Sequence, residues 1–178
     1  MIRAYLTNII ALPSLIAKRH KTLSLGKSYS TLLTKPSEGF DDLTIIVPCY
    51  NYSAYVCEAL DSIELQSKMP TEVIIINDGS TDNSKEVIEK YLAKHAKSPI
   101  KYRFIDKSNE GVIATKNLAL TEVSTNYMMF LDADDMLDKN YVEKTLKTIR
   151  YDNSDIVYTD MEMFGSISTV QKTRPFSK

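Results

Sequence analysis

The chain alternates short apolar runs with segments of helical periodicity, and this order constrains the fold more than any other feature. The apolar runs cover residues 43–47, 72–76, 100–105 and 127–131. They have strand length, are rich in β-branched and aromatic residues, and end at turn residues, which predicts strands. Between them, apolar residues recur every three or four positions, as on a helix that packs by one face. This α/β order predicts a mainly parallel, Rossmann-like sheet flanked by helices, with right-handed crossovers.

The boundaries of the helices are indicated by short polar residues. We expect N-caps at Ser53, at Asp82 or Ser84, and at Asp138, because these side chains accept hydrogen bonds from the first N–H groups of a helix. A further helix is predicted over residues 112–120, after a turn at 109–111. A fifth strand is predicted to begin at residues 155–159.

The fourth apolar run stops abruptly at three carboxylates, Asp132, Asp134 and Asp135. Carboxylates this close repel one another, and each raises the pKa of its neighbours. A divalent cation removes that penalty, and Mg²⁺ typically takes one or two carboxylates together with substrate phosphates. The alternative interpretation is a solvated turn that caps the next helix. Both stay open on this segment alone.

Polar turns follow three of the predicted strands, at residues 48–51, 77–80 and 132–135. In a parallel sheet the carboxyl ends of the strands meet at one edge. Ligands of such sheets bind beyond that edge, at the point where the strand order reverses. The three turns therefore predict a binding site.

Composition and charge limit the class of protein. The chain has 178 residues, 43% of them apolar and 25% charged, which suffices for one globular domain with a core. Its net charge is −1, so no overall field favours nucleic acid as a partner. The charge is uneven, because residues 1–40 carry six lysines and arginines against one glutamate. This predicts a basic segment, 1–40, joined to an acidic domain, 41–178.

The N-terminal segment has an apolar stretch at 4–17 and a basic cluster at 18–21. The stretch is shorter than the ~20 residues of a membrane-spanning helix, and Pro13 interrupts it. It predicts either a weak contact with anionic lipid or an arm that is flexible or docks elsewhere. Residues 22–40 have the composition of a linker. Two cysteines are too few for a disulfide framework, so the expected location is the cytoplasm, with the inner face of the membrane as the variant.

Four segments in this order carry a resemblance to a known family. They read TIIVPCYN (44–51), VIIINDGSTD (73–82), NEGVIATKN (109–117) and FLDADD (130–135). Together they resemble the nucleotide-sugar half of a family 2 glycosyltransferase with the GT-A fold, over roughly residues 42–165. The fourth segment is similar to the Asp-x-Asp motif of that family.

The resemblance implies a set of donor-binding residues: Pro48, Tyr50, Asn51, Asp78, Gly111, Lys116 and Asp132. Asp78 matches the acid that accepts a hydrogen bond from the nucleobase, a role that suits a carboxylate facing a ring N–H. Lys116 matches a position where the family often has arginine. Lysine still offers a cation to a phosphate, but without the two-pronged geometry of arginine. An ordinary exposed helix lysine is the competing interpretation.

The same resemblance implies the metal ligands and the reaction. Asp134 is the expected direct ligand of Mn²⁺ or Mg²⁺, and Asp132 is expected to contact the metal, its bound water or the ribose. Asp135 shares either role or caps the following turn. The donor is expected to be a UDP-sugar, with GDP and dTDP open. The metal would neutralise the departing diphosphate while an acceptor hydroxyl attacks with inversion.

The general base of the family lies in a second, acceptor-binding half, so we expect it beyond Lys178. Asp160 and Glu162 are acids in the right direction, and are equally typical of residues that flank a strand. The chain is thus expected to be the donor half of a longer, truncated enzyme that acts on a glycan or lipid-linked acceptor.

Two other functions remain open from the sequence. A non-catalytic nucleotide-sugar-binding module predicts metal-dependent binding without turnover. An unrelated phospho-acceptor protein predicts an acyl phosphate and no affinity for nucleotides, and it leaves segment 77–82 unexplained.

Overall fold

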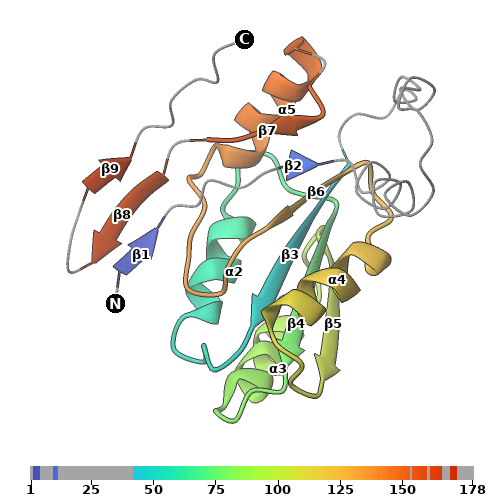
Figure 1. Ribbon diagram of the computed structural model, residues 1–178, viewed down its shortest axis with the longest axis vertical. Coiled ribbons are helices and arrows are strands. Elements are labelled where there is room, and N and C mark those ends of the chain that lie inside the picture. The colour runs from blue at the N-terminus through green and yellow to red at the C-terminus, as the bar shows by residue number, and fades with distance from the viewer. Residues whose placement is uncertain are drawn as a thin grey trace, which may run out of the picture.

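The computed structural model describes residues 2–4, 10–11, 42–152, 154–159, 161–165 and 169–171. Strands and helices alternate through the main domain, as predicted (Figure 1). The order is β3 (Leu43–Cys49), α2 (Val56–Glu64), β4 (Glu72–Asp78), α3 (Ser84–Lys94), β5 (Lys101–Lys107), α4 (Val112–Glu122), β6 (Tyr127–Phe130), α5 (Tyr141–Asp152) and β7 (Ile156–Val157).

The central sheet has the strand order β5-β4-β3-β6-β2-β7. Its first four strands are mutually parallel, which confirms the predicted sheet. The chain first builds outward from β3 to β4 and β5, and then returns to place β6 on the other side of β3. The strand order therefore reverses between β3 and β6, which is where ligands of such sheets bind.

Both faces of the sheet are covered, and the alternation of side chains along each strand assigns them. Ile45 and Ile75 belong to the larger core cluster, which also contains the buried apolar residues of α2, α3 and α5. Ile46 and Ile74 point to the other face and pack with Ala119 of α4. Burial on both faces explains why these strands are continuous apolar runs and not alternating ones.

The last part of the sheet differs from the prediction. The fifth strand is β7, only two residues long, and it does not pair directly with β6. Between them lies β2 (Ile10–Ala11), which is antiparallel to both. The first strand, β1 (Ile2–Ala4), pairs with β8 (Met161–Gly165), which pairs in turn with β9 (Thr169–Gln171).

Two pieces of segment 1–40, β1 and β2, thus pair with strands from later parts of the chain. A strand edge such as that of β6 carries unpaired N–H and C=O groups, and β2 pairs with them. The predicted linker, 22–40, lies outside the described residues. None of the described helices has the length and apolar character needed to cross a membrane.

Two predicted helix caps are wrong. The N-cap of α2 is Tyr55, and Ser53 instead donates its backbone N–H to Asp82 Oδ2 at 3.0 Å. The N-cap of α3 is Asn83, although Asp82 Oδ1 accepts the N–H of Ser84 at 2.9 Å. Asp82 thus joins the loop after β3 to the start of α3, because its two oxygens accept from Ser53 and from Ser84.

Candidate functional site

A cavity of about 430 Å³ lies beyond the carboxyl ends of β3, β4 and β6, beside the reversal of strand order. Its lining contains Pro48, Cys49, Tyr50, Tyr52, Asp78, Asn109, Gly111, Val112, Thr115, Lys116, Asp132, Ala133 and Asp134. Seven of the eight residues assigned to donor or metal from the sequence are among them. The exception is Asn51.

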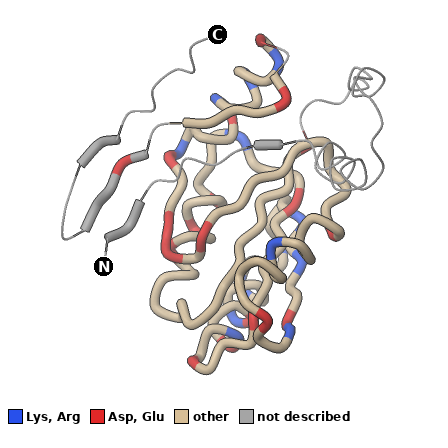
Figure 2. Tube along the Cα trace, in the orientation of Figure 1, with Lys and Arg blue, Asp and Glu red and all other residues tan. Residues whose placement is uncertain are grey.

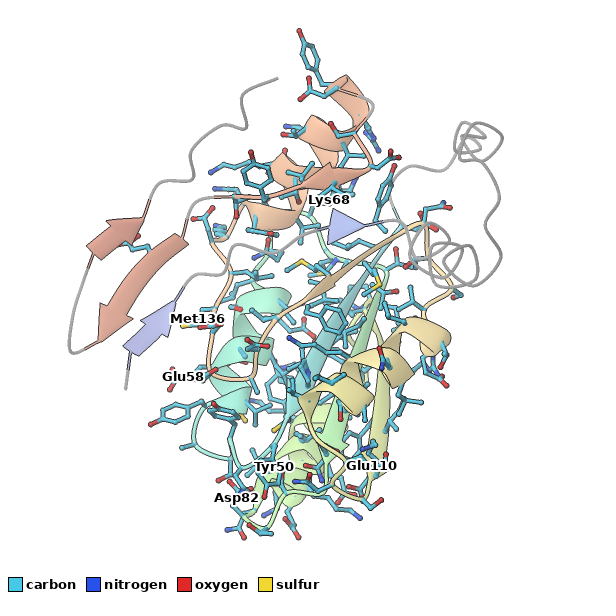
Figure 3. All side chains as sticks on the ribbon, in the orientation of Figure 1. Tyr50, Glu58, Lys68, Asp82, Glu110 and Met136 are labelled. Atoms are coloured by element: carbon cyan, nitrogen blue, oxygen red, sulfur yellow. The ribbon has the colours of Figure 1, made fainter. Side chains whose placement is uncertain are left out.

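The wall formed by the end of β3 is partly aromatic. Tyr50 keeps 44% of its surface exposed, so its ring is open to a ligand. Figure 3 shows Tyr50, Asp82 and Glu110 at the same end of the molecule, where β3, β4 and β5 end. The loops that carry Tyr50 and Glu110 contribute residues to the lining of the cavity.

Asn51 ties two of these loops together instead of lining the cavity. Its Oδ1 accepts the backbone N–H of Thr81 at 2.7 Å and that of Asp82 at 3.3 Å. Its own N–H donates to Ser80 Oγ at 3.0 Å. The backbone of Asn51 is left-handed, with φ 60°, a conformation that asparagine tolerates better than most residues. Asn51 thus holds two loops beside the cavity together without lining the cavity itself.

Asp78 is the buried acid of the cavity. Its Oδ1 accepts Lys107 Nζ at 2.5 Å and the backbone N–H of Glu110 at 3.0 Å. Burial alone would raise the pKa of Asp78, but these hydrogen bonds and the charge of Lys107 outweigh it and hold the pKa below its ordinary value. Asp78 is therefore a carboxylate, which accepts hydrogen bonds and donates none.

Two glycines bring the loops and α4 into place. Gly79, with φ +63°, lies so close to Asn109 that a Cβ would stand 2.4 Å from its backbone nitrogen. Gly111, with φ +86°, is the N-cap of α4, and a Cβ there would meet nothing within 4 Å. Gly111 and Val112 line the cavity, so the N-terminus of α4 opens onto it. The unpaired N–H groups and the dipole of that terminus favour an anion.

Thr115 adds a polar group to the floor of the cavity. It is 1% exposed, and its Oγ1 has no hydrogen-bond partner within the described part of the chain. It lies close enough to Asp78 that its hydroxyl contributes to the low pKa of that acid. A buried hydroxyl without a partner is uncommon in a native protein and asks for an explanation.

The acidic end of the cavity carries Asp132 and Asp134, and in Figure 2 the loop after β6 is red where its acids lie. Lys116 Nζ lies 3.8 Å from Asp132 Oδ1 and 5.2 Å from the centre of the Phe130 ring. Asp135 is buried and does not line the cavity. Among the described residues, neither lining acid makes a close ion pair, and Lys116 is the cation that lies near Asp132.

The acids also act on a neighbouring phenol. Burial raises the pKa of Tyr52, and the negative charges of Asp134, Asp132 and Asp135 raise it further. Across the described ranges, no group of three or more His, Cys, Asp or Glu residues forms a metal cage. One or two carboxylates are what Mg²⁺ usually takes from a protein when phosphates supply the other oxygens, and Asp132 with Asp134 fits that donor set.

Sequence reasoning missed Lys107, which the structure places against Asp78. The signal was available in principle, because Asp78 and Lys107 are register partners at the ends of β4 and β5. It needs the pairing of two strands, which the sequence alone does not align. Of the two downstream acids, Asp160 lies outside the described residues and Glu162 is an exposed residue of β8.

Comparison with known proteins follows the same segments. The sequence pattern described as "Glycosyl transferase family 2" matches residues 44–174. The chain is 36% identical over 127 residues to "Glycosyltransferase GlyA" of Streptococcus pneumoniae, covering 70% of this chain and 17% of that protein. It is 39% identical over 123 residues to "Teichoic acid poly(glycerol phosphate) polymerase" of Staphylococcus epidermidis, covering 68% and 16%.

Among solved structures, S. aureus TarS in complex with UDP matches with a TM-score of 0.55 and 30% identity. The match covers 64% of this chain and 33% of the TarS chain. A TarS complex with UDP-GlcNAc matches with the same TM-score and 29% identity. The chain therefore spans a sixth to a third of the length of these relatives.

Proposed function

The chain belongs to glycosyl transferase family 2, and we propose that it binds the nucleotide-sugar donor of a metal-dependent, inverting glycosyltransferase. One observation carries the proposal. A single cavity at the reversal of strand order joins a buried carboxylate, the N-terminus of α4, a lysine and two further carboxylates. A nucleoside diphosphate needs these groups in one place: an acceptor for its base, an anion site for its phosphates, and acids for a metal that bridges them.

The nucleoside would occupy the side of the cavity near β3 and β4. Tyr50 presents a partly exposed ring, which can stack on a base. Asp78 is buried and ionised, so it can accept from a ring N–H. The similar TarS structures contain UDP and UDP-GlcNAc, which supports uridine as the nucleoside here.

The diphosphate would lie between α4 and the loop after β6. The N-terminus of α4 offers N–H groups and a positive dipole end, and Gly111 leaves open space for close approach. Lys116, one turn further along the same helix, supplies a full positive charge beside the acids. We assign the phosphates to this pair of groups.

Asp134 and Asp132 would hold Mn²⁺ or Mg²⁺. Such an ion, when bound, neutralises the negative charge that grows on a departing diphosphate. Lys116 lies on the same side and offsets part of that charge through the protein itself. Asp135, being buried, is assigned to the folding of the turn and not to the ion.

In the proposed reaction, the bond between the anomeric carbon and the diphosphate oxygen breaks while an acceptor hydroxyl forms a new bond on the opposite face. A base takes the hydroxyl proton, and we still expect it beyond Lys178. The acceptor is a glycan or a lipid-linked glycan, and the place is the cytoplasm, with the basic segment 1–40 contacting the inner face of the membrane.

Thermal unfolding with and without nucleotide tests the proposal. UDP, GDP and dTDP are compared in Mn²⁺ and in EDTA, because a ligand at a hundred times its Kd stabilises a protein by about 2.7 kcal/mol. We expect one nucleotide to raise the Tm in Mn²⁺ only, and Asp134→Asn to abolish the rise. Asp152→Asn, at the exposed end of α5, is the control and should behave as the wild type.

A cooperative transition that no nucleotide shifts would refute the donor site. A shift without transfer to any acceptor would support the binding-module interpretation for this chain.

A further inference from the structure

Two side chains with no role in the proposed function converge on Asp78. We propose that Lys107 is a positioning residue and Thr115 a specificity-determining residue, which together make Asp78 select nucleobases that present a carbonyl beside a ring N–H. The inference rests on the proposed function, since it requires the cavity to hold the base of a nucleotide.

The two oxygens of Asp78 are used unequally. Both hydrogen bonds that reach it, from Lys107 Nζ and from the N–H of Glu110, end on Oδ1. Within the described ranges no hydrogen bond ends on Oδ2, although Asp78 is 4% exposed and lines the cavity. Oδ2 is therefore an acceptor that a ligand in the cavity can use.

Lys107 is committed to holding this arrangement. Its side chain is 13% exposed, and its amine contacts Asp78 Oδ1 at 2.5 Å, Glu110 Oε2 at 2.9 Å and the carbonyl oxygen of Ser108 at 2.8 Å. An ammonium group has three N–H donors, so all three are engaged. Lys107 is also absent from the cavity lining. It therefore acts on a ligand through Asp78 and not by direct contact.

Thr115 supplies the matching donor. Within the described part of the chain, its buried hydroxyl makes no hydrogen bond of ordinary length, it lines the cavity, and it lies near enough to Asp78 to help lower the pKa of that acid. A hydroxyl can turn its hydrogen toward a carbonyl oxygen of a ligand. The pair then presents one acceptor and one donor side by side. That pattern is complementary to a ring N–H next to a carbonyl.

The charge of Asp78 turns this pattern into a selection. Uracil, thymine and guanine carry a ring N–H beside a carbonyl. Cytosine has a ring nitrogen acceptor at the corresponding place, which a carboxylate repels and to which a protonated carboxyl would donate its O–H. Burial pushes Asp78 toward the protonated form, and Lys107 opposes that push. Without Lys107 the discrimination should weaken.

Calorimetric titration with UDP and CDP tests the inference, because these ligands differ only at the edge of the base. We expect the wild type to prefer UDP by a factor on the order of tenfold to hundredfold, as for other buried sites in which a mismatched partner leaves polar groups unpaired. Thr115→Val keeps the shape and removes the hydroxyl. It should lower the affinity for UDP by roughly tenfold and leave the affinity for CDP unchanged, so that the preference for UDP over CDP becomes smaller.

Lys107→Met removes the charge and keeps the length of the side chain. Its affinity for UDP, divided by that of the wild type at the same pH, should fall as the pH is lowered from about 7 to about 5, because Asp78 then takes up a proton. Taking the ratio at each pH cancels the ionisation of the diphosphate. Lys107→Arg should restore the wild-type profile.

Lys85→Met is the matched control. It removes another lysine that pairs with an acid of β5, Asp106, outside the cavity. It should change neither the preference nor the pH profile.

The outcomes separate the two proposals. If UDP binds and folded Thr115→Val and Lys107→Met both keep the wild-type preference and pH profile, the inference is overturned and the donor site stands. If Lys107→Met does not fold, Thr115→Val decides by the same criterion. If no nucleotide binds to the wild type, the proposed function fails, and the inference fails with it.

Discussion

The side chain of Asn51 joins the loop after β3 to the loop after β4, since its Oδ1 accepts the backbone N–H of Thr81 at 2.7 Å. The contact spans the crossover from β3 through α2 to β4. It also explains the left-handed backbone of Asn51, which turns the amide toward Thr81. The position of Tyr50, one residue earlier, therefore depends on a loop that belongs to another strand.

We expect Asn51→Ala to lower the free energy of unfolding by about 2–3 kcal/mol, from the lost hydrogen bonds and from the cost of a left-handed alanine. Asn51→Asp is the control, because aspartate keeps the acceptor and tolerates the same backbone. It should cost less than half as much. Urea unfolding of the three proteins measures the difference, and equal losses in both variants would contradict the role given to the amide oxygen.

Most of the sheet could be predicted from the sequence because its strands are buried on both faces. Ile45, Ile46, Ile74 and Ile75 make apolar runs that hardly fit another element, and α2 and α5 bury residues at helical spacing. The polar turns at the strand ends then had to meet at one edge, where the cavity lies. The predicted resemblance to family 2 glycosyltransferases is confirmed by the family match over residues 44–174.

What could not be predicted depends on contacts between segments far apart in the chain. Lys107 meets Asp78 only because β4 and β5 pair in one particular register. Ser53 is of a residue type that is preferred at helix N-caps, yet its N–H bonds to Asp82, 29 residues away. The insertion of β2 between β6 and β7 follows from an unpaired strand edge, which has no signature in local composition.

Gly79 and Gly111 both have a positive φ but differ in the space around them. Gly79→Ala should lower the free energy of unfolding by about 3–5 kcal/mol, because the new methyl group adds a clash with the backbone of Asn109 to the backbone strain. Gly111→Ala meets open space and should cost only the backbone strain, about 1–3 kcal/mol, because φ 86° with ψ 162° is a conformation that glycine almost alone adopts. Urea unfolding tests both variants. A Gly111→Ala loss as large as that of Gly79→Ala would show that the clash does not matter.

The low pKa of Asp82 predicts that the folded protein loses stability in acid. Burial would raise its pKa, but the hydroxyl and N–H of Ser84 and the N–H of Ser53 outweigh burial and lower the pKa to about 2. The folded pKa lies below the ordinary value of about 4, so the stabilisation is complete above pH ~4 and is lost as the pH falls toward ~2.

Asp82→Asn should remove this part of the pH dependence. After allowance for solvent screening, we expect the difference in unfolding free energy between wild type and variant to shrink by about 1–2 kcal/mol between pH ~5 and pH ~2. Urea unfolding at several pH values measures it. Asp152→Asn is the exposed control and should follow the wild type. A difference that does not vary with pH would contradict the low pKa of Asp82.

A variant of Lys116 can distinguish binding of the phosphates from binding of the nucleoside. Lys116→Met should lower the affinity for UDP by about tenfold. A charge-assisted hydrogen bond to phosphate contributes roughly 1.5–3 kcal/mol, and the exposed position of Lys116 reduces this contribution. Uridine, which has no phosphate, should bind equally to the wild type and to the variant. Lys147→Met, on α5 and 71% exposed at its side chain, is the control for loss of a lysine.

Calorimetric titration with both ligands gives the comparison. The prediction depends on Lys116 lying beside Asp132 at 3.8 Å, where a phosphate that bridges to a metal would pass. If Lys116→Met weakens uridine as much as UDP, the lysine supports the shape of the cavity and not the phosphates. If it weakens neither ligand, Lys116 is an ordinary helix lysine, and the N-terminus of α4 holds the diphosphate without it.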